Sequence, residues 1–599
     1  VIDLQDGKVV HPASGRALSY RELASEIASE PWSDDAPVTP PGKWTIAGKP
    51  ALRAEGQGQG RDTVTGRHRY PSDMSRPGML VGAVLRRPDM KATLASVDTS
   101  GAEALPGVIA MREGDFVGVA APDRRTARRA LAEIRAEWNI PSAPEGDQVS
   151  AESVFDYLKT HPADPQGYHR WAGPAVFEVG SLKAGRAEAA RASGPRGHTL
   201  EARYTIPYIA HAPLEPRAAL AEWDLEREGD GDGDGDRGSY RLTVWTGSQR
   251  PFGIRSELAM AFGIPEEAVR VIVPDTGGAY GGKHTGEAAI EAARLARAVG
   301  RPVKVAWSRE EEFTWAYLRP AGLIEVSSAV AADGKVTSWE YHNYNSGPEA
   351  MRPPYAIENQ LVAFHNTLSP LRQGSYRALA ATANHFARES HMDELAHLIG
   401  MDPLAFRLRN LPADETGERL RAVLLAAAER FGWGSSGATQ ETRDETGPEQ
   451  GRGAGIACGT EKGSFVAACA EVEVEEAGQG QTIRVVRIVE AFECGAIVNP
   501  EGLASQVEGA VVQALGGALF ERIDFAEGKI RTDRFSRYRV PRFGDIPNIE
   551  VVLLDRKDLP SAGAGETPIV GPAPAVANAV FDATGVRLRD LPLQLGPAQ

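Results

Sequence analysis

Short apolar runs that alternate with polar residues and end at glycine or proline turns recur along most of the chain. Residues 79–86, 108–114 and 116–122 have the pattern of short strands, and residues 123–138 have the spacing of an amphipathic helix with Ala127, Leu131 and Ile134 on one face. Strands and helices then alternate from about residue 201 to 411, and a second such segment runs from about 451 to the end. The pattern predicts a mixed α/β, α+β-type protein with several domains.

Changes in composition suggest where these domains begin and end. Residues 35–62 are rich in proline and glycine, and the opening segment at Val1 reads as a domain entered partway. The predicted division is an N-terminal remnant and linker at 1–61, a small α/β module at 62–140, a connecting segment at 141–200, and two larger α/β parts at 201–440 and 441–599.

The overall composition makes some classes of function more plausible than others. The 599 residues are 42% hydrophobic and carry a net charge of -15, which favours large cores and disfavours general binding of nucleic acid or anionic membrane. No apolar run approaches the roughly 20 residues of a membrane span, and the start has no signal-peptide pattern, so a soluble protein of either periplasm or cytoplasm is expected. Cys458, Cys469 and Cys494 fit no cluster or zinc spacing and are expected to be buried apolar residues.

The strongest local motif is "VRVIVPDTGGAYGGKHTGEAAIEAARLARAVG", residues 269–300. It predicts a strand, a glycine loop through Gly277–Gly282 and a helix that ends at Gly300, an order that can present backbone N–H groups and a helix N-terminus to an anion. A tight turn that needs positive φ at several glycines is an equally good interpretation. The spacing of Gly277 and Lys283 also fits a nucleotide-binding P-loop, but His284 stands where that loop needs Ser or Thr for magnesium.

Three further polar residues stand next to predicted helices. Gln249 follows a strand, Arg377 precedes a helix of small residues, and Gln506 shares a helix face with Gln513 in "NPEGLASQVEGAVVQALGGALFE". Asn499 and Pro500 are the expected N-cap and first residue of that last helix. Each polar residue, taken alone, is more often a cap, loop hydrogen bond or salt bridge than a ligand contact.

Glu566 is the one charged residue in "SAGAGETPIVGPAPAVANAV", residues 561–580. A carboxylate among small residues that seal it from water suits a general base, since burial raises the pKa of a carboxyl group towards the working range. The other interpretation is that this glutamate decorates an exposed Gly/Pro turn.

Together these blocks resemble the molybdenum-binding large subunit of the xanthine dehydrogenase/aldehyde oxidase family. "TGGAYGGK" resembles its cofactor loop, "TGSQ" its cofactor-side glutamine, "QVEGAVVQALGGALFE" its cofactor helix and "GAGETP" its catalytic glutamate loop. Residues 62–140 resemble its small "hammerhead" domain, and "YRALAATANHF" is similar to the isoquinoline 1-oxidoreductase beta-subunit-like branch. The likeness spans roughly residues 62–593 and implies a hammerhead domain with two molybdenum-cofactor-binding domains.

The resemblance implies a hydroxylase or dehydrogenase that oxidises an N-heterocycle or aldehyde with water as oxygen source. In this family Glu566 would be the base on Mo–OH, hydride would pass to Mo=S, and pterin sulfurs would hold the metal, so no protein metal ligands are expected. The resemblance assigns the catalytic set Glu566, Gln249 and Arg377, and the cofactor-binding set Gln249, Gly278, Ala279, Tyr280, Gly281, Gly282, Arg377 and Gln506.

The resemblance also sets expectations for cofactors and partners. It implies molybdopterin in its cytosine dinucleotide form, a partner subunit with [2Fe-2S] clusters, and a cytochrome or flavin subunit. No "GQG…T" cofactor block is found, since the glycines at 56–60 lie in a linker without a following helix; we expect that the block is lost here or is carried by a separate chain. His284 and Tyr280 depart from the usual Glu and Phe. The alternatives are a non-catalytic scaffold or cofactor-binding chain and, third, a P-loop NTPase.

Overall fold

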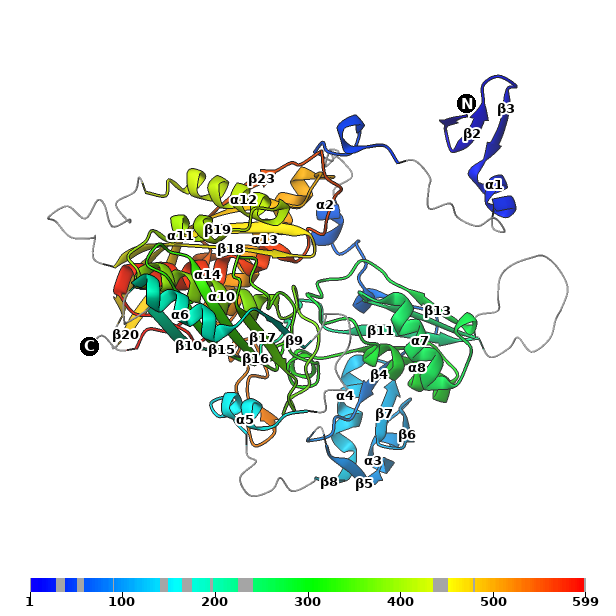
Figure 1. Cartoon of the computed structure of the whole chain (residues 1–599). Coiled ribbons are helices and arrows are strands. Elements are labelled where there is room, and N and C mark those ends of the chain that lie inside the picture. Colours follow the sequence, from blue (N-terminus) through cyan, green and yellow to red (C-terminus); the bar gives the residue numbers. More distant parts are fainter. Residues whose placement is uncertain are drawn as a thin grey trace.

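The computed structural model describes residues 2–27, 38–50, 59–89, 91–140, 149–163, 175–193, 198–224, 241–434, 451–477 and 480–596. Figure 1 shows several sheets with helices packed against them, in a mixed α/β architecture. The alternating Gly and Asp residues at 229–236, whose sequence predicts an acidic hairpin tip, lie outside the described residues.

A sheet of seven strands joins the small N-terminal module to the following part of the chain. Its order is β13 (Val269–Ile272), β12 (Leu242–Thr246), β11 (Ala218–Trp223), β14 (Val303–Ala306), β4 (Leu80–Val84), β7 (Phe116–Ala121) and β6 (Ile109–Glu113). Strand β4 pairs in parallel with β14, so the module predicted at 62–140 shares one sheet with residues from 201–440. The predicted boundary at residue 140 therefore does not separate two sheets.

Two helices cover different faces of this sheet. Helix α8 (Glu287–Val299) contacts β11, β14 and β4, and α4 (Arg124–Glu133) contacts β4 and β7 with α3 (Ser100–Glu103). Gly82 in β4 allows α8 to approach, because a Cβ there would lie 2.6 Å from Leu295 Cδ1. Strands β5 (Thr93–Asp98) and β8 (Arg135–Asn139) form a separate antiparallel pair.

Residues 176–554 contribute two further sheets with helices between them. One has the order β10 (His198–Ile206), β15 (Gly322–Val330), β16 (Val336–Tyr344), β17 (Gln360–His365) and β9 (Val176–Val179); the other has the order β18 (Arg452–Glu461), β19 (Ser464–Ala477), β20 (Gly480–Glu493) and β23 (Asn548–Leu554). Helix α10 (Ala381–Leu398) contacts both sheets and packs on α14 (Pro572–Thr584). Gly453 and Gly455 let α14 lie against β18, since a Cβ at either would meet helix backbone within 2.3 Å.

The remaining elements surround these layers. They are β1 (Asp3–Gln5), β2 (Lys8–His11), β3 (Arg16–Ser19), α1 (Tyr20–Ile27), α2 (Gln59–Val64), α5 (Val154–Thr160), α6 (Leu182–Ser193), α7 (Pro251–Phe262), α9 (Arg309–Thr314), α11 (Pro403–Asn410), α12 (Glu415–Phe431), α13 (Pro500–Leu519), β21 (Phe525–Ala526) and β22 (Lys529–Ile530). Strands β1–β3 form their own small sheet, and Figure 1 shows it away from the other sheets.

Most predicted elements are confirmed. The helix after the glycine loop ends before Gly300, which has φ +61°, and Asn499 caps α13 by accepting a hydrogen bond from Gly502 N at 3.1 Å. All three cysteines are buried and free. No helix within the described ranges is long and apolar enough to cross a membrane.

Three predictions about elements are wrong. The helix at 123–138 ends at Glu133, and its last residues form β8 because Ala136 and Trp138 pack into the hydrophobic core of the module instead of continuing the helix. The composition of residues 141–200, rich in Ala, Gly, Pro and charge, predicts a long irregular connection, but its described residues contain α5, β9 and α6. A helix is present at the glycine-rich stretch, since α2 begins at Gln59 and includes its last glycine, Gly60.

Candidate functional site

Arg377 and Ala378 connect the glycine loop to the loop that carries Glu566. Arg377 N donates to Tyr280 O at 2.9 Å, and Ala378 N donates to Glu566 Oε1 at 3.1 Å. The segment just before α10 therefore lies between two loops that are almost 290 residues apart in the sequence. Its unusual backbone, with φ +63° at Ala378 and +50° at Leu379, turns consecutive N–H groups towards different partners.

The guanidinium group of Arg377 extends this connection to helix α13. Its Nε donates to Gly565 O at 2.6 Å, its Nη1 to Gln513 Oε1 at 3.2 Å, and its Nη2 to Gln506 Oε1 at 3.3 Å. Desolvation lowers the pKa of Arg377 from its ordinary value, although the group remains a cation at any physiological pH. The structure thus brings Arg377, Gln506, Glu566 and the glycine loop together.

The glycine loop has the turn geometry that its sequence suggests. Gly278 and Gly281 have φ of +96° and +97°, and Tyr280 between them has +55°. A Cβ at Gly281 would lie 2.8 Å from Tyr376 Cα, so this position needs glycine both for its backbone angle and for close approach. Gly282 packs against His211, whose Nε2 lies 2.6 Å from Ser375 O, so this ring also holds the loop next to Arg377.

The N–H groups of the loop are not bare, which corrects the prediction of an open anion cradle. Gln249 Oε1 accepts from Gly281 N at 3.1 Å and from Lys283 N at 3.4 Å. Gly277 N donates to Glu215 Oε2 at 2.8 Å, and Gly286 N, at the start of α8, donates to Glu257 Oε2 at 2.7 Å. The protein's own carboxylates and amide satisfy these donors, since an unpaired buried N–H is costly.

Lys283 also rules against a nucleotide-binding P-loop. Its side chain is 2% exposed, its Nζ donates to Glu215 O at 2.9 Å, and it lies 3.4 Å from Glu215 Oε2. Burial lowers the pKa of Lys283 from its ordinary value, and the Glu215 carboxylate opposes that shift. A lysine buried in this pair stabilises the glycine loop through Glu215 and cannot contact a phosphate.

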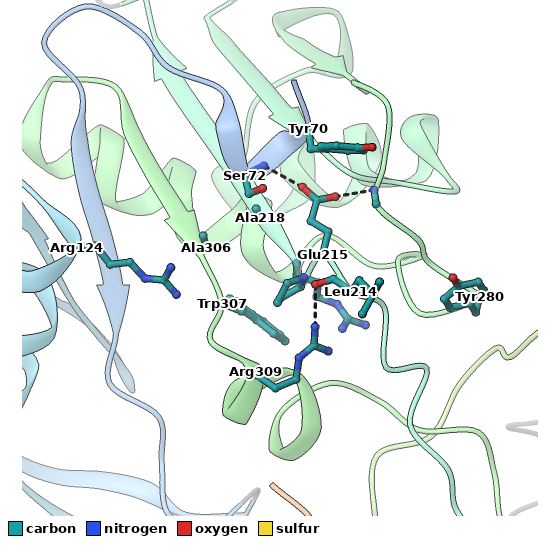
Figure 2. Close-up of a pocket in the computed structure, with 13 residues that line it drawn as sticks. Tyr70, Ser72, Arg124, Leu214, Glu215, Ala218, Tyr280, Ala306, Trp307 and Arg309 are labelled. Carbon is teal, nitrogen blue, oxygen red and sulfur yellow. Dashed lines mark hydrogen bonds between the residues drawn. The ribbon is translucent and has the colours of Figure 1, made fainter. Parts of the chain in front are cut away.

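A cavity of about 690 Å³ lies on one side of the glycine loop. Figure 2 shows Glu215 beside Ser72, with Tyr280 at the edge of the cavity. The Glu215 carboxylate accepts hydrogen bonds from Ser72 N at 3.0 Å and from Gly277 N at 2.8 Å. Tyr280 is 43% exposed, and its ring lies over Gly278. Tyr280 therefore lines an open cavity and covers the loop at the same time.

Glu566 differs from the expected water-shielded base. Its side chain is 35% exposed, and its Oε2 forms an ion pair with Lys462 Nζ. Residues 567–570, directly after Glu566, are buried. The small residues therefore exclude water from the segment that follows Glu566, but not from its carboxylate. The carboxylate is held by two partners, Ala378 N and Lys462, in place of a dry pocket.

Glu461 and His284 also lie close enough to Glu566 to interact with its charge. Burial raises the pKa of Glu461 to about 7, Lys462 opposes this shift, and the charges of Glu349 and Glu566 add to it. Burial lowers the pKa of His284, as does the charge of Arg250, while the Glu566 carboxylate raises it. The charge of the Glu566 carboxylate therefore reaches the His284 ring.

Sequence reasoning missed Lys462, Glu461 and the role of Gln513. Lys462 and Glu461 stand in an ordinary "TEKGS" hairpin turn, where a charged residue is the normal solvent-exposed choice. Gln513 shares a helix face with Gln506, and that seven-residue spacing was the one signal for it. Among the described residues, no three His, Cys, Asp or Glu side chains lie together as metal ligands.

Comparisons with known proteins match this chain to molybdopterin-binding domains and to subunits of oxidoreductases. Family models of the molybdopterin cofactor-binding domain match residues 168–411 and 459–547. The chain is 30% identical to a subunit of the nicotinate dehydrogenase of Pseudomonas putida, over 99% of its own length and 50% of that protein. It is 26% identical to the beta subunit of isoquinoline 1-oxidoreductase from Brevundimonas diminuta, covering 100% of this chain and 79% of that one.

A solved structure shows the same fold. Quinoline 2-oxidoreductase from Pseudomonas putida 86 matches with a TM-score of 0.73 at 19% identity, covering 92% of this chain and 97% of that chain. The fold and these matches define a molybdopterin-binding chain. It belongs to the molybdenum-binding large subunits of the xanthine dehydrogenase/aldehyde oxidase family, and it spans half the length of its nicotinate dehydrogenase relative.

The residues at the site fit such a cofactor. The Oε1 atoms of Gln249 and Gln506 accept hydrogen bonds from the protein, while their Nε2 groups donate to no described residue. Both amide ends are thus free donors for the oxo and pterin oxygens of a bound cofactor. Gly509 lies on the same face of α13 as Gln506 and Gln513, and a Cβ there would meet nothing within 4 Å. This donor set, held by Arg377, suits an oxygen-rich planar ligand.

Proposed function

We propose that this chain is the molybdenum-cofactor subunit of a hydroxylase or dehydrogenase that oxidises an N-heterocycle or an aldehyde with water as oxygen source. The observation that carries the proposal is the position of Arg377, which binds the Glu566 loop, the glycine loop and α13 at once. When bound, the cofactor supplies the oxidation chemistry. The named relatives act on nicotinate and isoquinoline, which supports an N-heterocycle as substrate.

Glu566 is the proposed base. Its Oε1 is fixed by Ala378 N, so Oε2 is the oxygen that accepts the proton, and Lys462 must release that oxygen as it does so. The exposed pair with Lys462 can break readily, because such pairs contribute about 0–1 kcal/mol. Gln249 and Gln506 orient the cofactor through their free Nε2 groups, and Arg377 keeps the loop of Glu566 against α13.

The proposal includes the cytosine dinucleotide form of molybdopterin and a partner subunit with [2Fe-2S] clusters. It also includes a second chain with the "GQG" cofactor block and a cytochrome or flavin subunit as electron acceptor. The support is that the named relatives are subunits of larger enzymes and that the chain spans half of one of them. Identification of co-purifying polypeptides by mass spectrometry tests these partners directly.

The test of the function compares Glu566→Gln with Glu429→Gln, an exposed glutamate on α12. In the purified complex, molybdenum should remain near one per chain in both variants. Turnover of an N-heterocycle or aldehyde should fall by about 10²–10⁴-fold in Glu566→Gln alone, the usual contribution of a general base. Normal turnover in Glu566→Gln refutes the base role; a wild-type complex that holds molybdenum but never turns over indicates the scaffold alternative.

A further inference from the structure

Helix α4 presents a face of arginine side chains to solvent. Arg125, Arg128 and Arg129 are exposed, while Ala127 and Ala130 are buried against the small module. The spacings i, i+3 and i+4 place the three guanidinium groups on one side of the helix. The other side of α4 packs on β4, β7 and α3 (Figure 1). The three exposed residues are called the arginine face below.

The chain itself does not neutralise these charges. Among the residues that the structure describes, none of the three guanidinium groups forms an ion pair or a side-chain hydrogen bond. Asp123, whose carboxylate interacts with the charge of Arg125, is the N-cap and accepts from Thr126 N at 2.8 Å and Thr126 Oγ1 at 2.9 Å. Exposed arginines elsewhere do find carboxylates, since Arg409 and Arg430 each form an ion pair at 2.6 Å.

The arginine face is unfavourable for the helix that carries it. Arg125 lies one turn before Arg129, and like charges at that spacing repel each other. Arg125 is also in the first turn, where the helix dipole favours acidic residues, and α4 has no acidic residue there. The three charges therefore cost the free chain some stability, and an anionic partner would offset that cost.

The chemistry of the face favours protein carboxylates over a membrane or a nucleic acid. All three cations are arginines, whose planar fork can bind a carboxylate through two hydrogen bonds. A helix that lies on a membrane needs an apolar face for the lipid, whereas Ala127, Ala130 and Leu131 of α4 pack into the core of the module. The net charge of -15 opposes the approach of the chain to extended polyanions.

We infer that the arginine face of α4 is a docking surface for an acidic segment, rich in Asp or Glu, of a partner subunit. The inference goes beyond the proposed function, which names partner subunits but no surface for them, and needs from it only that a partner exists. Arg124, the residue before this face, lines the cavity that Gly277 and Tyr280 also line. Figure 2 shows Arg124 across that cavity from Tyr280, so the docked partner adjoins the cavity beside the glycine loop.

The first experiment detects the contact chemically. Arg125→Lys/Arg128→Lys/Arg129→Lys keeps the charge and adds amines, which a carbodiimide couples to carboxylates in direct contact. In the purified complex this variant should form crosslinks to acidic peptides of another polypeptide, identified by mass spectrometry. The control Arg421→Lys should form none, since Arg421 is exposed on α12 and its side chain donates only to Leu408 O. Crosslinks confined to this chain, or none at all, overturn the inference.

The second experiment measures association of the subunits by sedimentation. Replacing the three arginines with glutamine should raise the dissociation constant about 10-fold, because three exposed charge pairs are lost, while the lysine variant should change it little. Raising the salt from about 0.05 M to about 0.5 M should weaken the wild-type complex more than the glutamine variant. Equal dissociation constants for these two proteins contradict the docking role. Neither experiment measures turnover, so both can fail while the proposed function holds.

The stability of the full chain separates docking from a role in folding. The glutamine variant should melt at the wild-type temperature or up to about 2 °C higher, since repulsion within α4 is removed. A lower melting temperature shows that the arginines support the fold and overturns the inference. Sedimentation of the wild-type chain with vesicles that contain phosphatidylserine, lost in the glutamine variant, assigns the face to a membrane and overturns it as well.

Discussion

The Nε group of Arg377 donates to the carbonyl oxygen of Gly565 at 2.6 Å, one residue before Glu566. Since the same guanidinium group also reaches Gln506 and Gln513, one side chain sets the distance between the Glu566 loop and α13. A planar fork with several donors suits this task, and a lysine ammonium does not.

Arg377→Lys should therefore reduce turnover by about 100-fold, because a misplacement of about 1 Å has that effect on a catalytic group. Steady-state kinetics and molybdenum content of the complex are the measurements. Arg430→Lys is the control, since Arg430 is 61% exposed and pairs with Glu550 on the surface. Equal turnover in the two variants contradicts the role of Arg377.

Gly281→Ala should destabilise the chain by about 2–4 kcal/mol, since it adds a steric clash to the cost of a positive φ. The new Cβ would lie 2.8 Å from Tyr376 Cα, and backbone there cannot move without shifting Arg377. Gly585→Ala separates the two effects, because Gly585 has φ +73° but nothing within 4 Å of the position that a Cβ would take. Urea unfolding of both variants gives the comparison; similar losses would show that close approach contributes nothing.

Lys283→Met should cost about 3–5 kcal/mol, the usual loss when one partner of a buried pair is removed. Lys283 is 2% exposed and its partner Glu215 is 8% exposed, so the remaining carboxylate would be buried without a cation. Lys557→Met is the exposed comparison, where the pair with Asp555 is 3.6 Å long and 55% and 33% exposed, and the expected loss is below about 1 kcal/mol. Thermal melting with and without ATP adds a check, because no nucleotide should raise the melting temperature.

Glu490→Gln should stabilise the chain increasingly as pH rises from 5 to 8. Both carboxylate oxygens of Glu490 are buried without a hydrogen-bond partner, and burial raises its pKa well above the ordinary value, with Arg377 opposing the shift. The Glu490 carboxyl group of the unfolded state releases its proton above about pH 4.3, whereas that of the folded state holds the proton to a higher pH. Its contribution to stability is therefore complete below about pH 4.3 and is lost as the pH rises towards the folded pKa. Glutamine copies the neutral acid and removes this loss.

Glu550 on the paired strand β23 should behave in the opposite way. A hydrogen bond from Arg487 lowers its pKa, so its contribution is present above the unfolded pKa and is lost as pH falls through the lower folded value. Glu550→Gln should thus lose stability at pH 7 and approach the wild type as the pH falls below the lowered pKa of Glu550. Melting curves of Glu490→Gln and Glu550→Gln across pH measure these two stability changes. The same pH dependence in both variants would contradict the opposite directions predicted for them.

Local patterns in the sequence determined the elements and the class of protein. The glycines at 278 and 281, the cap at Asn499 and the end of α8 at Gly300 follow from backbone sterics that act over a few residues, and the order of these blocks carries the family resemblance. The same local reasoning extended the helix at 123–138 too far, because the pairing of its end with β5 is a long-range contact.

The site itself was decided by tertiary structure. Nothing near Glu566 in the sequence indicates Lys462, which is 104 residues away, or the exposure that this ion pair implies. Nor does the motif "TGGAYGGK" reveal that Gln249 and Glu215 already occupy its N–H groups. Hydrogen bonds and charge pairs form between groups that the packed layers bring together. The sequence therefore shows which polar residues are present, and only the fold decides which of them come into contact.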